Sequence, residues 1–419
     1  MAIWSKVAPL SDFAARAEAA AAAMRDVFPP TPLARNDYLS NRFDAEIWLK
    51  REDLTPVRSY KIRGAFNAMR KLSGGRVACA SAGNHAQGVA WMCRHLGVDG
   101  VIFMPVTTPG QKIEKTRLFG GDRVEVRLVG DFFDATLSAA QAYCTETGAH
   151  FLSPFDDADV IEGQGSVAVE ILEQMDGVPD LIVMPVGGGG LSSGMLAYFR
   201  AKGIVPDIRF VEPTGGASLT AALAAGHPVT LDTLDSFVDG AAVARIGARN
   251  FDILRQVPPQ HVLRVPENRI CITIQEMLNI EGIVLEPAGA MSIDALRDLG
   301  PEIEGRRVVC IATGGNFDFE RLPDVKERAM RHAGLKKYYV IRMPQRPGAL
   351  RDFLDILGPD DDIARFEYLK KSVRNFGTVL IGIESTTPDS FARLETRMAA
   401  DGLAARDLTN DPLLGELVI

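Results

Sequence analysis

A lysine at a predicted helix start is the residue of this chain whose position best suits covalent chemistry. Lys61 lies in the stretch Ser59-Tyr60-Lys61-Ile62-Arg63-Gly64-Ala65, followed by apolar residues spaced for a helix. The positive end of a helix disfavours a cationic amine and lowers its pKa. An uncharged amine is the form that condenses with a carbonyl group. Position alone does not separate this role from that of an ordinary solvated lysine, so the neighbouring motifs must decide.

Three motifs that contain glycine follow short apolar runs of strand length. The motifs are Ser81-Ala82-Gly83-Asn84-His85, Gly187-Gly188-Gly189-Gly190-Leu191 and Thr313-Gly314-Gly315-Asn316. The runs before them, 77–80, 181–184 and 307–311, alternate with helical stretches, which predicts parallel sheets buried on both faces. Open parallel sheets bind ligands beyond the carboxyl ends of their strands. The three motifs are therefore predicted to share one site.

The four consecutive glycines at 187–190 predict an anion site. Glycine lets the backbone approach a phosphate closely, and the N–H groups at a helix start bind it. A tight turn without a ligand is the simpler alternative, but it does not need four glycines. No Lys-Ser/Thr pair follows, which excludes a P-loop, whereas a dinucleotide site stays open for this motif alone. A phosphate site combined with a reactive lysine predicts pyridoxal 5'-phosphate, which carries both a phosphate and an aldehyde.

Composition limits the possible partners. The chain has 419 residues, 47% of them apolar, and a net charge of −8. This acidic balance argues against nucleic acid and against anionic lipid surfaces. No apolar run reaches about 18 residues, so no membrane span is predicted. The five cysteines show no CxxC spacing, which favours reduced thiols in a cytoplasmic enzyme over a disulfide framework or a zinc site.

The pattern of elements predicts a catalytic region followed by a small regulatory domain. Residues 1–330 are expected to form two α/β lobes rich in parallel sheet, with the smaller lobe, roughly 55–150, inserted in the larger one. The charged stretch 331–336 is interpreted as a linker. Residues 337–419 have a βαββα order, typical of a separate α+β domain.

These motifs resemble the threonine ammonia-lyase (threonine dehydratase) family, which belongs to the fold type II pyridoxal-phosphate enzymes. The resemblance covers nearly the whole chain. It rests on the lysine, asparagine and glycine motifs above and on Glu286-Pro287-Ala288-Gly289-Ala290. Phe366-Glu367-Tyr368 and Leu380-Ile381-Gly382-Ile383-Glu384 resemble the single ACT-like regulatory domain of the shorter biosynthetic enzymes.

The resemblance implies a role for each motif. Lys61 would bind the cofactor covalently and later move the Cα proton of the substrate, and Asn84 would hydrogen-bond the 3-hydroxyl of the pyridine ring. The backbone of Ser81–His85 would hold the substrate carboxylate. Residues Gly187–Leu191 would bind the phosphate. Thr313 would face the pyridine nitrogen, where relatives often carry serine.

The implied reaction is the conversion of L-threonine, and secondarily L-serine, into a keto acid and ammonia. For threonine the product is 2-oxobutanoate, and the reaction is the entry to isoleucine biosynthesis. The alternatives are a serine dehydratase or racemase of the same fold and a non-catalytic amino-acid sensor. Ala82 stands where the racemases carry a catalytic serine, which counts against racemisation. Some relatives bind a cation near a Glu-Pro turn. Glu212-Pro213 is such a turn, but the acidic residue expected after it is absent, so no metal is predicted.

The C-terminal domain has two interpretations. It is either a regulatory site for isoleucine or valine, with Pro347-Gly348-Ala349-Leu350 receiving the amino-acid carboxylate, or a module that only pairs subunits. The resemblance implies a homo-oligomer, either a dimer or a tetramer.

Overall fold

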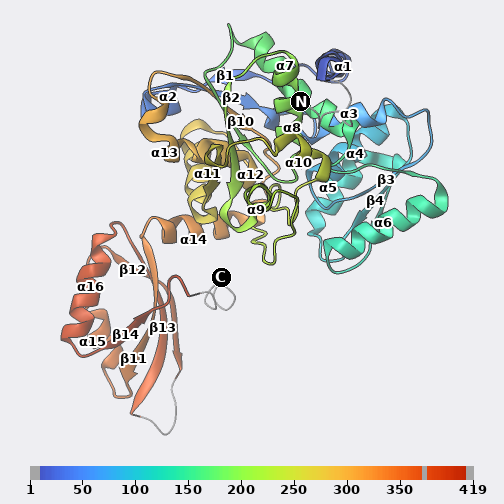
Figure 1. Ribbon diagram of the computed structural model, residues 1–419. Helices are drawn as coiled ribbons and strands as arrows, with labels where there is room; N and C mark the ends of the chain where they lie inside the picture. Colours follow the sequence, from blue (N-terminus) through green and yellow to red (C-terminus); the bar gives the residue numbers. More distant parts are fainter. Residues whose placement is uncertain (1–9, 370–374, 412–419) are drawn as a thin grey trace. The chain divides into compact units, whose positions relative to one another are not determined.

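The computed structural model describes residues 10–369 and 375–411 of the chain (Figure 1). The chain divides into two units, Met1–Phe317 and Asp318–Ile419. Unit 1 holds a six-stranded and a four-stranded sheet, and unit 2 holds a four-stranded antiparallel sheet. Among the described residues, none of the helices combines the length and apolar character that crossing a bilayer requires.

The larger sheet of unit 1 has the strand order β1-β2-β10-β7-β8-β9. All neighbouring pairs are parallel except β1 with β2. Its strands are β1 (Leu33–Arg35), β2 (Glu46–Arg51), β7 (Leu181–Pro185), β8 (Asp207–Pro213), β9 (Val262–Val265) and β10 (Arg307–Ala312). Every residue of β7 is buried, so the apolar run that predicted this strand reflects burial on both faces.

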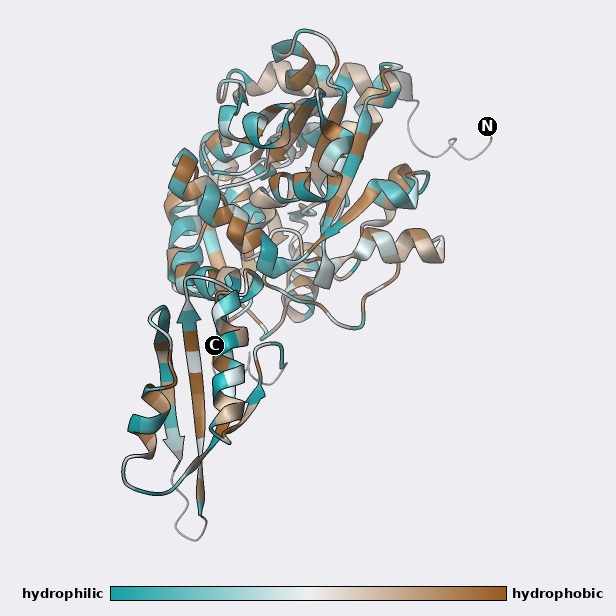
Figure 2. Cartoon of the chain, turned by 90° about the vertical axis from the view of Figure 1, so that its left-hand side faces the viewer, coloured by the Kyte–Doolittle hydropathy of each residue, from teal (hydrophilic) through white to brown (hydrophobic). Residues whose placement is uncertain are grey.

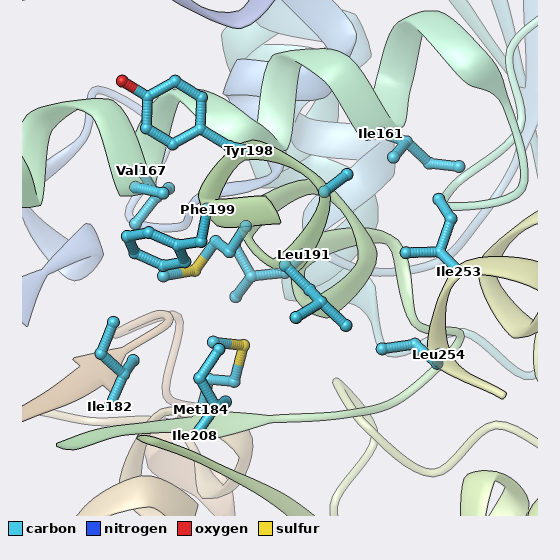
Figure 3. Close-up of a cluster of buried hydrophobic side chains, with 14 of the residues drawn as sticks. Ile161, Val167, Ile182, Met184, Leu191, Tyr198, Phe199, Ile208, Ile253 and Leu254 are labelled. Carbon is cyan, nitrogen blue, oxygen red and sulfur yellow. The ribbon is translucent and has the colours of Figure 1, made fainter. Parts of the chain in front are cut away.

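Helices pack on this sheet through apolar side chains. One face is covered by a core cluster that joins the sheet to α1 (Leu10–Met24), α7 (Ala158–Gln174), α8 (Gly190–Ala201) and α10 (Ala248–Leu254). Figure 3 shows Leu191 and Phe199 of α8 close to Ile182 and Met184 of β7. The remaining helices of the larger lobe are α2 (Asp37–Phe43), α9 (Ser218–Ala225), α11 (Glu267–Glu281), α12 (Pro287–Asp294) and α13 (Leu296–Leu299).

The smaller lobe is built on a parallel sheet of order β5-β4-β3-β6. Its strands are β3 (Val77–Ala80), β4 (Gly100–Met104), β5 (Val124–Leu128) and β6 (His150–Phe151), and its helices are α3 (Lys61–Met69), α4 (Asn84–Leu96), α5 (Gly110–Gly120) and α6 (Phe133–Thr147). The predicted two-lobed α/β arrangement with parallel sheets is confirmed. Figure 2 shows the hydrophobic residues running along the strands, with helices of mixed character.

Unit 2 contains one strand that the sequence did not predict. Its sheet order is β12-β13-β11-β14. The elements are α14 (Leu322–His332), β11 (Lys336–Pro344), α15 (Ala349–Leu354), β12 (Asp361–Leu369), β13 (Phe376–Ser385), α16 (Asp389–Ala400) and β14 (Ala404–Asp407). The expected βαββα order is therefore followed by a further edge strand. All four residues of β14 are exposed, so its sequence lacks the alternation that marks a half-buried strand.

The boundary between the units lies earlier than the predicted one at residue 330. Unit 2 begins at Asp318, and residues 331–336 include the end of α14 and the start of β11. The charges interpreted as a linker belong to two elements. Arg331 lies on α14, where it pairs with Glu327 four residues before it, and Lys336 begins β11, where it pairs with Glu384. A high density of charge is common to linkers and to exposed helices, which explains the difference.

Candidate cofactor site

Lys61 is the first residue of α3, as its motif predicted. Its Nζ donates a hydrogen bond to the carbonyl oxygen of Pro154 (2.9 Å) and lies 5.9 Å from the ring centroid of Phe155. The preceding residue, Tyr60, donates its backbone N–H to the carbonyl oxygen of Thr313 (3.1 Å). The start of α3 is thus tied to the loop that follows β10.

The amine of Lys61 is poised to lose its proton. Burial lowers the pKa of Lys61 to about 8, although the negative charge of Glu286 favours the protonated form. The sequence predicted that the helix end would lower this pKa, whereas the cause in the structure is desolvation by burial. A lysine with a pKa near 8 is uncharged far more often than a solvated one at neutral pH, as condensation with an aldehyde requires.

The four-glycine loop joins β7 to α8 and leaves no room for side chains. Gly189 has a φ of 92°, which side chains rarely allow. A Cβ at Gly187 would lie 3.0 Å from the backbone of Ala241, and one at Gly188 would overlap the ring of Phe155. Asn250 Nδ2 donates to the carbonyl oxygen of Gly188 (2.7 Å) and fixes the loop. The first N–H groups of α8 have no intrahelical acceptors, so this backbone can bind an anion.

Replacing Gly188 with alanine tests this loop. The new Cβ would displace Phe155 or the loop, so we expect the affinity for pyridoxal phosphate to fall at least about tenfold, the equivalent of one lost backbone hydrogen bond to the phosphate. Fluorescence titration of the apoprotein measures this affinity. Gly110→Ala is the matched control, because a Cβ there meets nothing within 4 Å. Equal affinities of the two variants would contradict a phosphate role for the loop.

Asn84 is the first residue of α4, and residues 81–83 separate it from the end of β3. Both the nitrogen and the oxygen of its side-chain amide form hydrogen bonds. Its Nδ2 donates to Glu286 Oε1 (2.7 Å), and its Oδ1 accepts from Asn316 Nδ2 (2.7 Å). Burial and the charge of Asp239 raise the pKa of Glu286 to about 7. Glu286 and Asn316 lie in the sequence motifs, but the sequence predicted no role for either residue. An acidic residue inside the otherwise apolar run 283–288 was the signal that could have found Glu286.

The rest of the loop after β3 places His85 in the protein interior. Its Nε2 lies 3.0 Å from the carbonyl oxygen of Leu152. Burial, together with the charge of Lys61, lowers the pKa of His85 to about 3. The ring is therefore neutral and donates to this carbonyl, which agrees with a packing or orienting role. Ser81, Ala82 and Gly83 complete the turn and are half-buried, so this backbone is accessible to a small ligand.

The loop after β10 brings Thr313 to the same site. Thr313 is buried, and the next residue, Gly314, forms an isolated bridge with Ser59. A Cβ at Gly314 would overlap the carboxylate of Glu286. The structure therefore places the lysine, asparagine and threonine motifs side by side, and Phe155 connects them to the glycine loop.

These groups fit pyridoxal phosphate. The aldehyde requires an amine, which Lys61 supplies with a pKa near 8. The phosphate requires a backbone cradle without side chains, which the four-glycine loop supplies. The pyridine ring requires a polar partner, which Thr313 supplies directly after β10. Asn84 Nδ2 uses one hydrogen for Glu286, and its second amide hydrogen has no acceptor in the described residues. That N–H can donate to a ring oxygen.

Glu212 and Pro213, interpreted from the sequence as a turn, end strand β8, and the carboxylate of Glu212 is bound by protein groups. Glu212 accepts hydrogen bonds from the backbone N–H groups of Leu219 (2.6 Å) and Thr220 (2.9 Å) at the start of α9. In the part of the chain that the structure describes, no three His, Cys, Asp or Glu side chains are grouped to hold a metal ion. The absence of a metal stays a prediction.

Comparison with known proteins matches each unit to a protein-family model. Residues 24–314 match the family model of pyridoxal-phosphate dependent enzymes, and residues 327–418 match the C-terminal regulatory domain of threonine dehydratase. The biosynthetic L-threonine dehydratase of Bacillus subtilis (strain 168) is 46% identical over 403 residues, which cover 94% of this chain and 95% of that protein. The corresponding protein of Staphylococcus aureus (strain NCTC 8325 / PS 47) is 45% identical over 384 residues, 90% of this chain and 91% of its own.

A solved structure of a threonine deaminase has a similar fold. The processed form of threonine deaminase isoform 2 from Solanum lycopersicum superposes with a TM-score of 0.70 at 36% identity. The match covers 76% of this chain and 94% of that one.

Proposed function

The chain belongs to the family of pyridoxal-phosphate-dependent threonine dehydratases, and we propose from this membership and the site geometry how its residues convert L-threonine into 2-oxobutanoate and ammonia. The observation that supports the proposal most is the convergence of Lys61, the 187–191 loop and Thr313 on one site. The reaction opens isoleucine biosynthesis. The water lost when the β-hydroxyl leaves is balanced by the water that later releases ammonia.

Each residue has a distinct part in this reaction. Pyridoxal phosphate, when bound, supplies an electron sink for negative charge at the substrate Cα. Lys61 anchors the aldehyde and takes the Cα proton at Nζ, for which a pKa near 8 is suited. The N–H groups of Gly187–Leu191 hold the phosphate, and Asn84 donates to the ring oxygen. The backbone of Ser81–His85 holds the substrate carboxylate.

Thr313 favours elimination over competing reactions. Its hydroxyl, unlike a carboxylate, does not enforce a protonated pyridine nitrogen, so negative charge at Cα persists for less time and the β-hydroxyl leaves promptly. Ala82 has no hydroxyl that could deliver a proton from the opposite side of the substrate, which disfavours racemisation. L-Serine carries the same leaving group and is a secondary substrate.

The test of this function is a keto-acid assay on the purified protein with pyridoxal phosphate. We expect 2-oxobutanoate from L-threonine, a slower release of pyruvate from L-serine, and no D-serine. Formation of D-serine without keto acid would replace this proposal with racemisation. Cofactor binding without any product would favour an amino-acid sensor.

Unit 2 is proposed to regulate the reaction in response to isoleucine or valine. It matches the regulatory domain of threonine dehydratase. An open cavity of about 460 Å³ lies between its β11, α15 and β12, and its lining combines the cations Arg346 and Arg351 with the apolar Leu350 and Leu354. This combination suits the carboxylate and the branched side chain of such an effector.

Removal of residues 318–419 tests this regulation. We expect the truncated protein to keep its activity and to lose inhibition by isoleucine, because the cavity is removed with unit 2. In the full chain, Arg346→Ala should raise the inhibitory concentration of isoleucine about tenfold through loss of one charge-assisted contact. Arg393→Ala, at an exposed position of α16, serves as the control. Undiminished inhibition of the truncated protein would place the effector site in unit 1.

The assembly and location of the protein are proposed from the same family resemblance. A homo-oligomer, dimer or tetramer, in the cytoplasm is in keeping with an enzyme of amino-acid biosynthesis. Light scattering of the purified full chain distinguishes these assemblies from a monomer.

A further inference from the structure

A chain of hydrogen bonds runs from α5 of the smaller lobe to the larger lobe and returns to Asn84 at the start of α4 in the smaller lobe. Lys115 on α5 donates from Nζ to Asn316 Oδ1, and Asn316 Nδ2 donates to Asn84 Oδ1 (2.7 Å). Asn316 lies in the loop after β10, whereas α5 belongs to the smaller lobe. None of these contacts was used in the proposed reaction.

Lys115 and the carbonyl group of Val57 fix the orientation of the Asn316 amide. An ammonium group only donates hydrogen bonds, so the atom facing Lys115 must be the oxygen of Asn316. A carbonyl only accepts, and Asn316 Nδ2 also lies 2.8 Å from the carbonyl oxygen of Val57. A reversed amide would place its NH₂ group against the ammonium and its oxygen against this carbonyl, and both contacts would be repulsive.

The orientation of Asn316 in turn fixes that of Asn84. Because Asn316 donates to it, Asn84 must present its oxygen to Asn316 and its NH₂ group to the opposite side, where Glu286 accepts (2.7 Å). The second hydrogen of this NH₂ group is the one available to the cofactor. With the order reversed, Asn84 would offer the cofactor an acceptor in place of a donor.

We propose that Lys115, acting through Asn316, is a positioning residue that holds the amide of Asn84 as a hydrogen-bond donor toward the cofactor. This inference rests on the proposed contact of Asn84 with the ring oxygen. It also makes that donor depend on the apposition of the two lobes, because Lys115 and Asn316 come from different lobes.

The same helix supplies a matched control. Lys112 lies one turn before Lys115 on α5 and also reaches the larger lobe, where its Nζ is 2.5 Å from Asp239 Oδ2. Both lysines act on the carboxylate of Glu286 through their charge. Lys112→Met therefore removes the same charge from the same helix but leaves the contacts of Asn316 and Asn84 in place.

The experiment compares Lys115→Met, Asn316→Asp, Lys115→Arg and Lys112→Met as holoenzymes. The readouts are the absorbance spectrum of the bound cofactor and kcat with L-threonine. We expect Lys115→Met and Asn316→Asp to shift the absorbance maximum and to lower kcat about tenfold, the effect of losing one well-oriented hydrogen bond. The variant with both changes should lose no more than about twofold beyond either single change, because both act through Asn84. Lys115→Arg keeps a hydrogen-bond donor and should therefore keep the absorbance maximum and the kcat of the wild type.

The controls separate this inference from the proposed role of Asn84. Lys112→Met should keep the wild-type spectrum and a kcat within about twofold of the wild type. If Lys115→Met and Lys112→Met are indistinguishable, the positioning role is wrong. If Asn84→Ala changes the spectrum while Lys115→Met and Asn316→Asp do not, only this inference fails. If Asn84→Ala also leaves the spectrum unchanged, both this inference and the cofactor contact of Asn84 are wrong.

Discussion

Replacing Lys61 with alanine is expected to lower the conversion of L-threonine by more than about a thousandfold, because both the covalent anchor and the group that moves the Cα proton are lost. The pKa of Lys61, near 8 because of burial, provides the free amine for both tasks. The assay measures 2-oxobutanoate formed by the wild type and the variant at saturating pyridoxal phosphate. Borohydride should fix the cofactor to the wild type and not to the variant.

A lysine outside the site provides the control for this experiment. Lys202 follows α8 at the protein surface, and its Nζ pairs with Glu18 at 3.0 Å. We expect Lys202→Ala to keep both the activity and the borohydride-stable cofactor. Substantial activity of the Lys61 variant, with cofactor still fixed by borohydride, would assign the reaction to another lysine.

The positions of the candidate site residues could be predicted largely from the sequence because each residue lies in a continuous motif. Lys61, Asn84, the 187–191 loop and Thr313 each follow or begin an element that the apolar pattern predicts. Parallel strands gather their carboxyl ends at one edge of a sheet, so the convergence of the loops after β7 and β10 follows from topology. Sheet geometry is sufficient for these two loops, whereas Asn84 follows β3 of the other sheet, and the packing of the two lobes brings it to Asn316.

The residues that orient this site could not be predicted in the same way. Lys115 has the sequence context of a surface lysine, and only the packing of the two lobes brings it to Asn316. The short strand β14 has no apolar alternation, and the charges of α14 resembled a linker. The contact of Lys115 with Asn316 and the pairing of β14 with β11 join segments far apart in the chain, so no local pattern records them. The charges of α14 do form local pairs, but such charges are common to linkers and to exposed helices.

A buried cluster of four charges holds α3, and with it Lys61, in place. Arg63 forms two hydrogen bonds with Glu52 (2.7 and 2.8 Å) and two with Glu170 (2.7 and 2.8 Å). Lys50 Nζ lies 2.6 Å from Glu170 Oε2. All four side chains are almost fully buried. The cluster joins α3 to α7 and β2, and its two cations balance its two carboxylates.

Replacing Glu170 with glutamine is expected to lower the free energy of unfolding of unit 1 by about 3–5 kcal/mol at pH 7, because Lys50 and Arg63 then face one carboxylate in the dry interior. Trp48 and Trp91 lie in unit 1, so urea unfolding followed by tryptophan fluorescence measures the change. Glu173→Gln is the control. Glu173 lies on the same helix but is paired with Arg25 at the surface, so its loss should cost less than about 1 kcal/mol.

The pH dependence distinguishes loss of this ion cluster from a simple packing defect. Burial alone would raise the pKa of Glu170, but Arg63 and Lys50 outweigh it and lower the pKa to about 2. A carboxyl with a pKa near 4.3 in the unfolded chain and about 2 in the folded protein contributes roughly 3 kcal/mol above pH 5, and this contribution is lost as the pH falls toward 2. The wild type should therefore lose its advantage over Glu170→Gln between pH 5 and about 2. A difference that stays constant over this range would mean that Glu170 stabilises the protein through packing and neutral hydrogen bonds, and that the buried charges do not hold α3 in place.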